Sequence, residues 1–252
     1  MTTKFTPEFM LARVLYRDGL MLVVDKPAGI AVHRGPKGGG AFEDYFDALR
    51  YGLQAPPSLA HRLDKDTSGC LVLGRHRKAL AHLGLLFKHG KIGKAYWAVV
   101  EGGPAEDEGT IDIAMSKLNV ERGWWMKPDP NGMPSQSTWK VIGRGADTSG
   151  KPLTWLALEP VTGRTHQLRV HCAAMGFPIY GDNIYGSAPQ FGGPVMHLQS
   201  REIVVPISKN KPPVTVRAPV PEHMHDKLAL CRWVEGEHPS TVIASAPRNE
   251  NN

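Results

Sequence analysis

Apolar residues along this chain recur at two different spacings, which separate expected strands from expected helices. Short apolar runs bounded by glycine, proline or charged turns predict strands at 20–24, 70–73, 95–100, 110–115, 137–142, 154–158, 195–205 and 214–217. Apolar residues three and four apart predict helices at 41–52, 77–89, 165–175 and 221–233, with a short helix or irregular segment at 8–18. Glycines stand where three of these helices should end: Gly52, Gly90 and Gly176.

The order of these elements indicates the class of fold. Strands dominate the second half of the chain without strict strand–helix alternation, and several neighbours are joined by Gly-rich turns, which favours antiparallel hairpins. We therefore expect an α+β domain with a mostly antiparallel mixed sheet flanked by helices. This domain should cover 20–235, after an N-terminal lead-in at 1–19 and before a disordered tail at 236–252 that contains Pro, Ser and Asn.

Composition narrows the class of protein only slightly. The 252 residues are enough for one large core, and a hydrophobic content of 41% separates the chain from disordered proteins. A net charge of +6 is compatible with nucleic-acid binding, as it is in many unrelated proteins. The three cysteines form no C-x-x-C pair, which argues against a zinc ribbon or a disulfide framework and favours a reducing cytoplasm. No signal peptide and no apolar stretch of membrane-spanning length is visible, so we expect no membrane association.

The segment from His61 to Leu71 carries the strongest chemical signal. It places a carboxylate, Asp64, two residues after a cation, Arg62, in a loop that leads into an apolar strand. A partly buried carboxylate needs a positive partner to remain charged, and Arg164 in the segment 163–169 is the candidate. Taken alone, such an Arg-x-Asp is usually a surface ion pair of little energetic value.

The segment 163–169 also has a purely structural interpretation. Thr165 would cap the start of a helix, and Gln167 and Arg169 would then lie on its exposed face.

Five ordered segments decide between these interpretations. The first is Leu22–Gly29, the second is His61–Asp64 with Thr67–Gly69, and the third is Lys94–Ala98. The fourth is Gly163–His171 with Gly176, Pro178–Ile179 and Gly181–Asp182, and the fifth is Arg217–Pro219. Together they resemble the RluA-type pseudouridine synthases of ribosomal and transfer RNA, over about residues 20 to 220. The resemblance implies a single pseudouridine-synthase catalytic domain with a central active-site cleft.

Two features depart from many of these relatives. The first motif begins near residue 20, which leaves no room before it for an S4-type RNA-binding domain. The run Met196-His197-Leu198 stands where relatives often have Leu-His-Ala, which we interpret as a tolerated change in packing.

The resemblance implies catalytic roles for three residues. Asp64 matches the family's catalytic aspartate, Tyr96 its active-site tyrosine, and Arg164 is expected to be the ion partner of Asp64. Conversion of uridine to pseudouridine breaks the C1′–N1 bond and rejoins the base through C5, so no cofactor and no metal are expected. The carboxylate can add to the base or the sugar, or remove a sugar proton, and the sequence leaves these open.

Other residues are expected to bind the RNA. The target uridine must leave its stack, which costs a few kcal/mol, and Arg62 is placed to fill the gap or to hold a phosphate. We also expect His61, Lys94 and Arg169 to contact the RNA. The substrate would be ribosomal RNA, transfer RNA or both, and we expect a monomer.

Rival interpretations remain at this stage. A non-catalytic RNA-binding protein would need the positive charge but not an intact Asp64, Tyr96 and Arg164. A metal-dependent hydrolase is disfavoured because His166 and His171 are five residues apart and lack the glutamate of a zinc-hydrolase helix.

Two further segments attract attention without being decisive. The run Gly38-Gly39-Gly40 lacks the Lys-Ser/Thr of a phosphate-binding loop and is interpreted as a flexible turn. Trp124 and Trp125 lie in a loop-like stretch at 121–133. We expect them either to stack on RNA bases or to form a hydrophobic lid on the sheet.

Overall fold

The computed structural model describes residues 5–35, 38–119, 124–208, 210–236 and 239. Its helices are α1 (Pro7–Ala12), the 3₁₀ helix η1 (Phe42–Leu49), α2 (Arg77–Lys88), α3 (Gln167–Ala174) and α4 (Glu222–Leu230). Its strands are β1 (Val14–Arg17), β2 (Met21–Lys26), β3 (Ser58–Leu59), β4 (Ser68–Gly74), β5 (Gly93–Glu101), β6 (Glu108–Asp112), β7 (Met115–Lys117), β8 (Met126–Pro128), β9 (Gln136–Ala146), β10 (Pro152–Pro160), β11 (Leu198–Val205) and β12 (Val214–Arg217).

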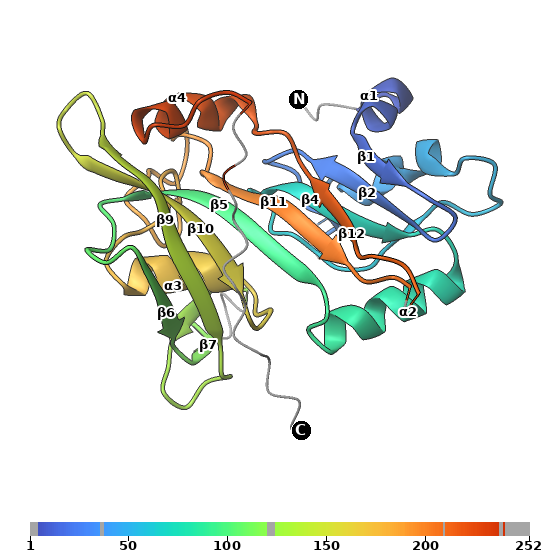
Figure 1. Cartoon of the computed structure of the whole chain (residues 1–252), viewed down its shortest axis with the longest axis horizontal. Coiled ribbons are helices and arrows are strands. Elements are labelled where there is room, and N and C mark those ends of the chain that lie inside the picture. The colour runs from blue at the N-terminus through green and yellow to red at the C-terminus, as the bar shows by residue number, and fades with distance from the viewer. Residues whose placement is uncertain (1–4, 36–37, 120–123, 209, 237–238, 240–252) are drawn as a thin grey trace.

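One ten-stranded sheet forms the body of the protein (Figure 1). Its main path runs β1-β2-β4-β11-β5-β10-β9-β6, with β3 on β4 and β12 on β11. The β11–β4 pair is parallel, and the other described pairs of this sheet are antiparallel. Strands β7 and β8 make a separate two-stranded hairpin. The expected α+β fold with a mostly antiparallel mixed sheet is thus confirmed.

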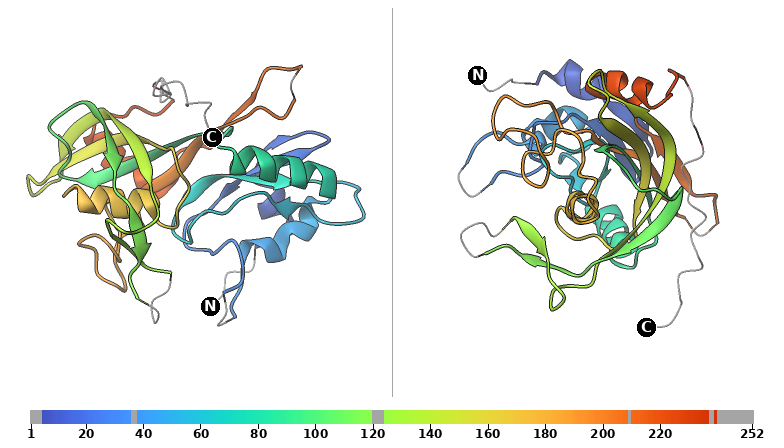
Figure 2. Two further views of the ribbon diagram at one scale, coloured as in Figure 1. Left: turned by 90° about the horizontal axis from the view of Figure 1, so that it is seen from below. Right: turned by 90° about the vertical axis from the view of Figure 1, so that its left-hand side faces the viewer.

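The central strands β5 and β11 join two halves of the sheet, and each half is covered on both faces (Figure 1). In one half, α3 packs over one face through Leu168 and α4 over the opposite face through Met224. In the other half, Phe46 of η1 and Leu83 of α2 belong to cores on opposite faces. Figure 2 shows η1 and α2 on the two sides of this half. Burial of both faces explains why these strands are almost continuously apolar in sequence.

Strand β5 positions the site because its side chains alternate between the two faces. Trp97 and Val99 face the core under α4, whereas Ala98 and Val100 face the core under α3. Tyr96 points to the same face as Ala98, and its ring packs against both the α3 core and the η1 core. The junction of the two halves on this face is therefore where a central cleft can form.

Three local expectations need correction. In the segment 8–18 the short helix is confirmed as α1, with Met10 fully buried, but the residues after it are not irregular, because β1 pairs with β2 from Val14 to Arg17. The helix expected at 41–52 is a 3₁₀ helix, η1. The Asp44 carboxylate caps its N-terminus by accepting a hydrogen bond from the Ala41 N–H. The single strand expected at 110–115 is divided between β6 and β7.

The expected disordered tail lies largely outside the described residues. Cys70, Cys172 and Cys231 are buried free thiols. In the ranges that the structure describes, no helix has the length and apolar character needed to cross a membrane.

Candidate active site

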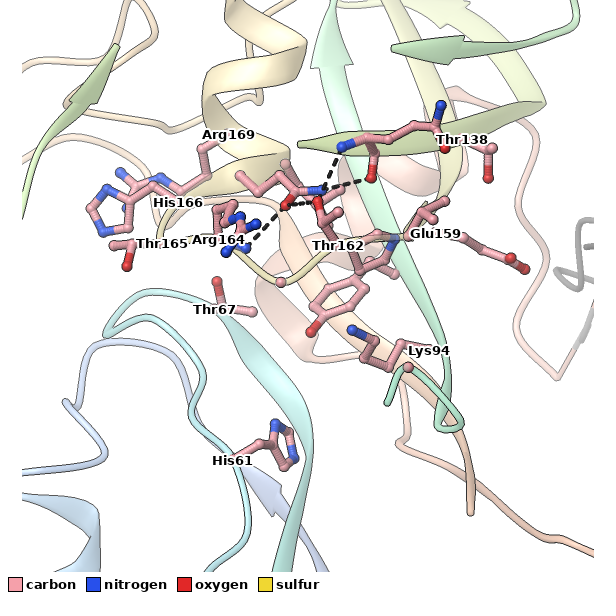
Figure 3. Close-up of a pocket in the computed structure, with 18 of the residues that line it drawn as sticks. His61, Thr67, Lys94, Thr138, Glu159, Thr162, Arg164, Thr165, His166 and Arg169 are labelled. Carbon is pink, nitrogen blue, oxygen red and sulfur yellow. Dashed lines mark hydrogen bonds between the residues drawn. The ribbon is translucent and has the colours of Figure 1, made fainter. Parts of the chain in front are cut away.

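A cleft of about 1420 Å³ opens on the face of the sheet where the two halves meet. All seven site residues expected from the sequence line it: His61, Arg62, Asp64, Lys94, Tyr96, Arg164 and Arg169. They come from the loop between β3 and β4, from β5, and from α3 and the segment that leads into it. Figure 3 shows His61 across the cleft from His166 and Arg169.

The loop that carries Asp64 is held from beneath by a buried lysine. Lys26, at the end of β2, is fully buried, and its Nζ donates hydrogen bonds to the carbonyls of Pro27 (2.8 Å) and Lys65 (3.0 Å). Burial lowers the pKa of Lys26 to about 7, although carboxylates nearby, Asp64 among them, favour its charged form. The backbone N–H of Gly29 also donates to the Lys65 carbonyl. The motif Lys26-Pro27-Ala28-Gly29 thus fixes the position of the Asp64 loop.

Gly69 explains how this loop enters the sheet. Its φ is +100°, and it lies opposite Ser200 in the parallel pair of β4 and β11. A Cβ at this position would lie 2.2 Å from the Ser200 carbonyl oxygen, so only glycine permits this approach of the two strands. The glycine therefore sets the distance between the Asp64 loop and the central strands.

Asp64 faces two positively polarised groups from the start of α3. Its side chain is 20% exposed, with Oδ2 at 4.0 Å from Nη1 of Arg169 and 3.9 Å from Nε2 of His166. Both distances are longer than a hydrogen bond, so the two neighbours attract the carboxylate without holding it in one orientation. This arrangement leaves the oxygens of Asp64 accessible from the cleft.

Arg169 is itself fixed by a buried partner. Its Nε and Nη2 donate to the two carboxylate oxygens of Asp182 at 2.7 and 2.8 Å, and both residues are almost fully buried. Burial alone would raise the pKa of Asp182, but the hydrogen bonds and charge of Arg169 lower it below its usual range. Asp182 also accepts the backbone N–H groups of Ile184 and Tyr185. This bidentate ion pair holds the guanidinium plane of Arg169 in one orientation.

The ion pair expected between Asp64 and Arg164 is wrong. The Nε of Arg164 donates to the Pro134 carbonyl at 3.1 Å, and the arginine that lies within 4.0 Å of Asp64 is Arg169. The reason is the position of α3, which begins at Gln167. Arg164 precedes the helix at the cleft wall, whereas Arg169 lies in its first turn on the buried side. Arg169, which we expected to bind RNA, is 2% exposed and takes the role given to Arg164.

Two of the remaining expected RNA-binding residues differ in what they can do. The Nε2 of His61 accepts the Val72 N–H at 3.0 Å, and its ring stacks on Phe87 at 4.5 Å. Burial, followed by the charge of Lys94, lowers the pKa of His61 to about 3. A neutral, hydrogen-bonded ring anchors the loop and cannot pair with a phosphate as a cation. Arg62, by contrast, is exposed at the cleft.

Tyr96 presents a protonated hydroxyl to the site. Burial raises the pKa of Tyr96, the negative charge of Asp64 raises it further, and a hydrogen bond with Ser200 opposes this. The hydroxyl therefore keeps its proton throughout the physiological range. With its ring packed between two cores, Tyr96 offers a fixed flat surface and a proton donor at the base of the cleft.

Sequence reasoning missed the residues that shape the segment before α3. Gln167 is buried, and its Oε1 accepts from the Thr162 hydroxyl (2.6 Å) and the Arg164 N–H (3.0 Å). Its Nε2 donates to the Gln136 carbonyl and the Ser137 hydroxyl. The structural interpretation that placed Gln167 and Arg169 on an exposed face, with Thr165 as the cap, is wrong.

The residue that caps α3 is His166, whose backbone is left-handed at φ 54°. The signal available in the sequence was the run of polar residues in a segment flanked by apolar strands. Buried polar side chains in such a place must find hydrogen-bond partners.

Trp124 lies beside this end of the cleft. Its side chain is 57% exposed, and its ring meets the His166 ring edge-on at 5.7 Å between centroids. Trp125, at 5.5 Å from Trp124, is only partly exposed. The exposure of Trp124 disfavours a hydrophobic lid, and base stacking stays a prediction.

The histidines that the structure describes show no metal-binding arrangement. Among the described residues, no three His, Cys, Asp or Glu side chains are grouped so that they could hold an ion. His171 is instead a core residue, with its ring nitrogens at 2.9 Å from the Ser135 hydroxyl and 3.0 Å from that of Ser137.

Comparison with known proteins identifies the class to which this fold and cleft belong. Residues 20–174 match the model of the RNA pseudouridylate synthase family, and the chain belongs to that family. It is an RNA pseudouridine synthase, an isomerase, of the RluA type, as the sequence motifs predict. The enzymatic interpretation therefore replaces the two rival ones.

Particular relatives support the same assignment. An uncharacterized RNA pseudouridine synthase of Zymomonas mobilis is 39% identical over 218 residues, which cover 85% of this chain and 96% of the relative. The ribosomal large subunit pseudouridine synthase C of Vibrio cholerae is 33% identical over 87% of this chain and 69% of its own. The solved structure of human RNA pseudouridylate synthase domain containing 1 superposes with a TM-score of 0.70 and 29% identity, over 86% of this chain and 85% of that one.

Proposed function

We propose that this enzyme isomerises specific uridines in structured RNA and that Asp64 is its catalytic carboxylate. The observation that carries the proposal is the convergence of Asp64, Tyr96 and Arg169 in one cleft, from three segments far apart in the chain. Arg169 places positive charge 4.0 Å from the carboxylate without a direct hydrogen bond, so the carboxylate oxygens stay free to react.

The reaction assigns a task to each of these groups. The target uridine leaves its stack and enters the cleft, where the Tyr96 ring supports the base. Asp64 acts as nucleophile on base or sugar, or as a base on the sugar, while the C1′–N1 bond breaks. The base turns, C5 bonds to C1′ and releases its proton, and N1, freed from C1′, takes up a proton. The atoms balance without an oxidant, a reductant or a second substrate, so activity should persist in EDTA when the RNA is shown to remain folded.

The rim of the cleft provides cations for the RNA backbone. Arg62 and Arg164 line it from opposite segments, and Lys88 and Lys94 line it from the end of α2 and the start of β5. Lysine and arginine side chains hold phosphates without reading sequence, so they position a folded RNA over the site. The choice of uridine must then come from RNA shape and from the energy needed to extrude the base.

Large-subunit ribosomal RNA is the substrate to test first, with transfer RNA second. The names of several relatives, including those of Vibrio cholerae and Buchnera aphidicola, specify the large ribosomal subunit. A gene-deletion strain, complemented with wild type or with Asp64→Asn, would be mapped for pseudouridine across all cellular RNA. We expect loss of one or a few large-subunit sites, restored by wild type alone. Loss confined to transfer RNA would move the substrate, and an unchanged map would contradict the proposal.

A further inference from the structure

The backbone of His166 is held in a conformation that needs a reason. It is a non-glycine residue at φ 54° and ψ 18°, directly before the first turn of α3, with 8% of its surface exposed. Left-handed backbone is disfavoured for a side chain with a Cβ and persists where the surroundings impose it, most often at functional sites. In this conformation the imidazole lies at the cleft beside Arg169 (Figure 3).

The hydrogen bonds of Tyr185 indicate which tautomer this ring adopts. The backbone N–H of Met126 in β8 donates to the Tyr185 hydroxyl oxygen at 2.9 Å. The hydroxyl oxygen lies 2.8 Å from Nδ1 of His166, where its own hydrogen finds an acceptor. With one lone pair of the hydroxyl oxygen occupied by the Met126 N–H, donation of the hydroxyl hydrogen to Nδ1 is the favoured arrangement, and it puts the ring hydrogen on Nε2.

This hydrogen faces the proposed catalytic carboxylate. Nε2 of His166 lies 3.9 Å from Oδ2 of Asp64, too far for a hydrogen bond but close enough for one after a small closure, or through one water. Burial is the largest influence on His166 and lowers its pKa. The carboxylates of Asp64 and Asp182 oppose this, whereas Arg169 and Arg62 lower the pKa further. Because the net shift is downward, the ring is neutral at physiological pH. Asp64 thus meets an N–H donor from His166 on the side where Arg169 supplies charge.

We propose that Tyr185 and His166 are positioning residues: the Tyr185 hydroxyl fixes the Nε2-protonated tautomer of His166, and that N–H orients Asp64 toward the flipped uridine. The inference rests on the proposed role of Asp64. Tyr185 and His166 connect the β7–β8 hairpin to the carboxylate: the Met126 N–H contacts the Tyr185 hydroxyl, the hydroxyl contacts Nδ1 of His166, and Nε2 of His166 faces Asp64. The orientation of the Asp64 carboxylate toward the uridine depends on Tyr185 and His166, and turnover depends on that orientation.

The tautomer is tested by nitrogen NMR of the histidine rings, which is independent of activity. In wild type, the His166 signal should show an unprotonated Nδ1 and a protonated Nε2. In Tyr185→Phe the acceptor at Nδ1 loses its donor, and the signal should shift toward a mixture of tautomers. An Nδ1-protonated ring in wild type, or an unchanged signal in Tyr185→Phe, would overturn the proposal.

The kinetic test compares Tyr185→Phe, which removes the hydroxyl beside Nδ1 of His166, with Tyr180→Phe, a tyrosine whose ring contacts His197 instead. We expect kcat to fall by about tenfold to a hundredfold in Tyr185→Phe, the cost of slight misplacement of a reacting group, with KM nearly unchanged. Tyr180→Phe should retain wild-type values. Asp64→Asn is assayed beside them: its inactivity shows that the proposed function stands, and normal turnover of Tyr185→Phe would then refute the positioning role alone.

A second pair of variants tests His166 itself at equal backbone cost. Gln and Met are similar in length and both must adopt the left-handed backbone, but only Gln carries an N–H donor near the place of Nε2. We expect His166→Gln to recover most of the kcat that His166→Met loses. Equal losses, at equal RNA affinity and equal melting temperature, would contradict the proposal, and this comparison decides if Tyr185→Phe does not fold.

Discussion

Nη1 of Arg169 lies 4.0 Å from Oδ2 of Asp64, while the other two guanidinium nitrogens, Nε and Nη2, are bound to Asp182. One arginine thus faces two carboxylates, the buried Asp182 and the partly exposed Asp64. The division matters because Asp182 takes the strong hydrogen bonds and leaves Asp64 with attraction at a distance. The oxygens of Asp64 therefore remain available to a substrate, with positive charge beside them.

Replacing Arg169 should be far more damaging than replacing Arg164. Arg169→Met leaves the buried Asp182 without its partner, which should cost about 3–5 kcal/mol of stability. It should also abolish turnover, because Asp64 loses its counter-charge. Arg164→Met, with the same loss of a guanidinium from the same segment, should unfold near the wild-type midpoint. Denaturant titration and tritium release on both variants decide it, and equal stabilities would show that the Arg169–Asp182 pair is not a stabilising element.

The same pair predicts how stability responds to acid. The pKa of Asp182 is lowered in the folded protein, so its ionised form stabilises the fold above the unfolded pKa, near 4. That contribution should disappear as the pH falls below about 4 toward the lower, folded pKa. Asp182→Asn should be less stable than wild type at pH 7 and should show a shallower loss of stability below about pH 4. Parallel pH curves for the two proteins would contradict the assignment.

Arg62 is expected to assist extrusion of the target uridine. It is exposed on the Asp64 loop, two residues from the carboxylate, with no part in the buried pairs described above. Arg62→Ala should lower turnover on folded RNA more than on a short unstructured RNA, where little unstacking is required. Both substrates would be assayed at the same salt concentration, since phosphate contacts are salt-dependent. Equal losses would mean that Arg62 holds a phosphate or the loop.

Trp124 is expected to stack on a nucleotide next to the target. Its side chain is 57% exposed and touches His166 at the edge of the cleft, as a stacking platform requires. Trp124→Ala should weaken RNA binding by about 1–3 kcal/mol, with little change in melting temperature. Leu85→Ala, which removes a side chain of 54% exposure on α2, is the matched control and should leave binding unchanged. A fall in stability without a fall in affinity would favour the hydrophobic-lid interpretation.

Much of the fold could be predicted because its signals are local. The alternation in β5 and the apolar runs of β2 and β4 reflect burial on one or both faces, and helix α2 ends where Gly90 predicts, within two residues. The type of helix at η1 was missed because apolar spacing does not separate a short 3₁₀ helix from an α-helix. The pairing of β1 with β2 was missed because a strand of four residues carries almost no pattern.

The cleft could be predicted more completely than the contacts inside it. Motifs assign residue types to a segment, and the whole expected set does line one cavity. They do not say which of two arginines five residues apart points inward, because that depends on where α3 begins. The left-handed turn at His166 places the helix start at Gln167, so Arg169 faces Asp64 and Arg164 does not. The place where α3 begins therefore goes with the choice of arginine beside Asp64.

The most direct test of the account is tritium release from RNA labelled at C5 of uridine, with Asp64→Asn beside wild type. The carboxamide keeps the shape of the side chain but can act neither as a nucleophile nor as a base. We predict release by wild type, background release by Asp64→Asn, and nearly equal RNA affinity and melting temperature for the two proteins. Release by Asp64→Asn within about tenfold of wild type would contradict the claim that Asp64 is the catalytic carboxylate.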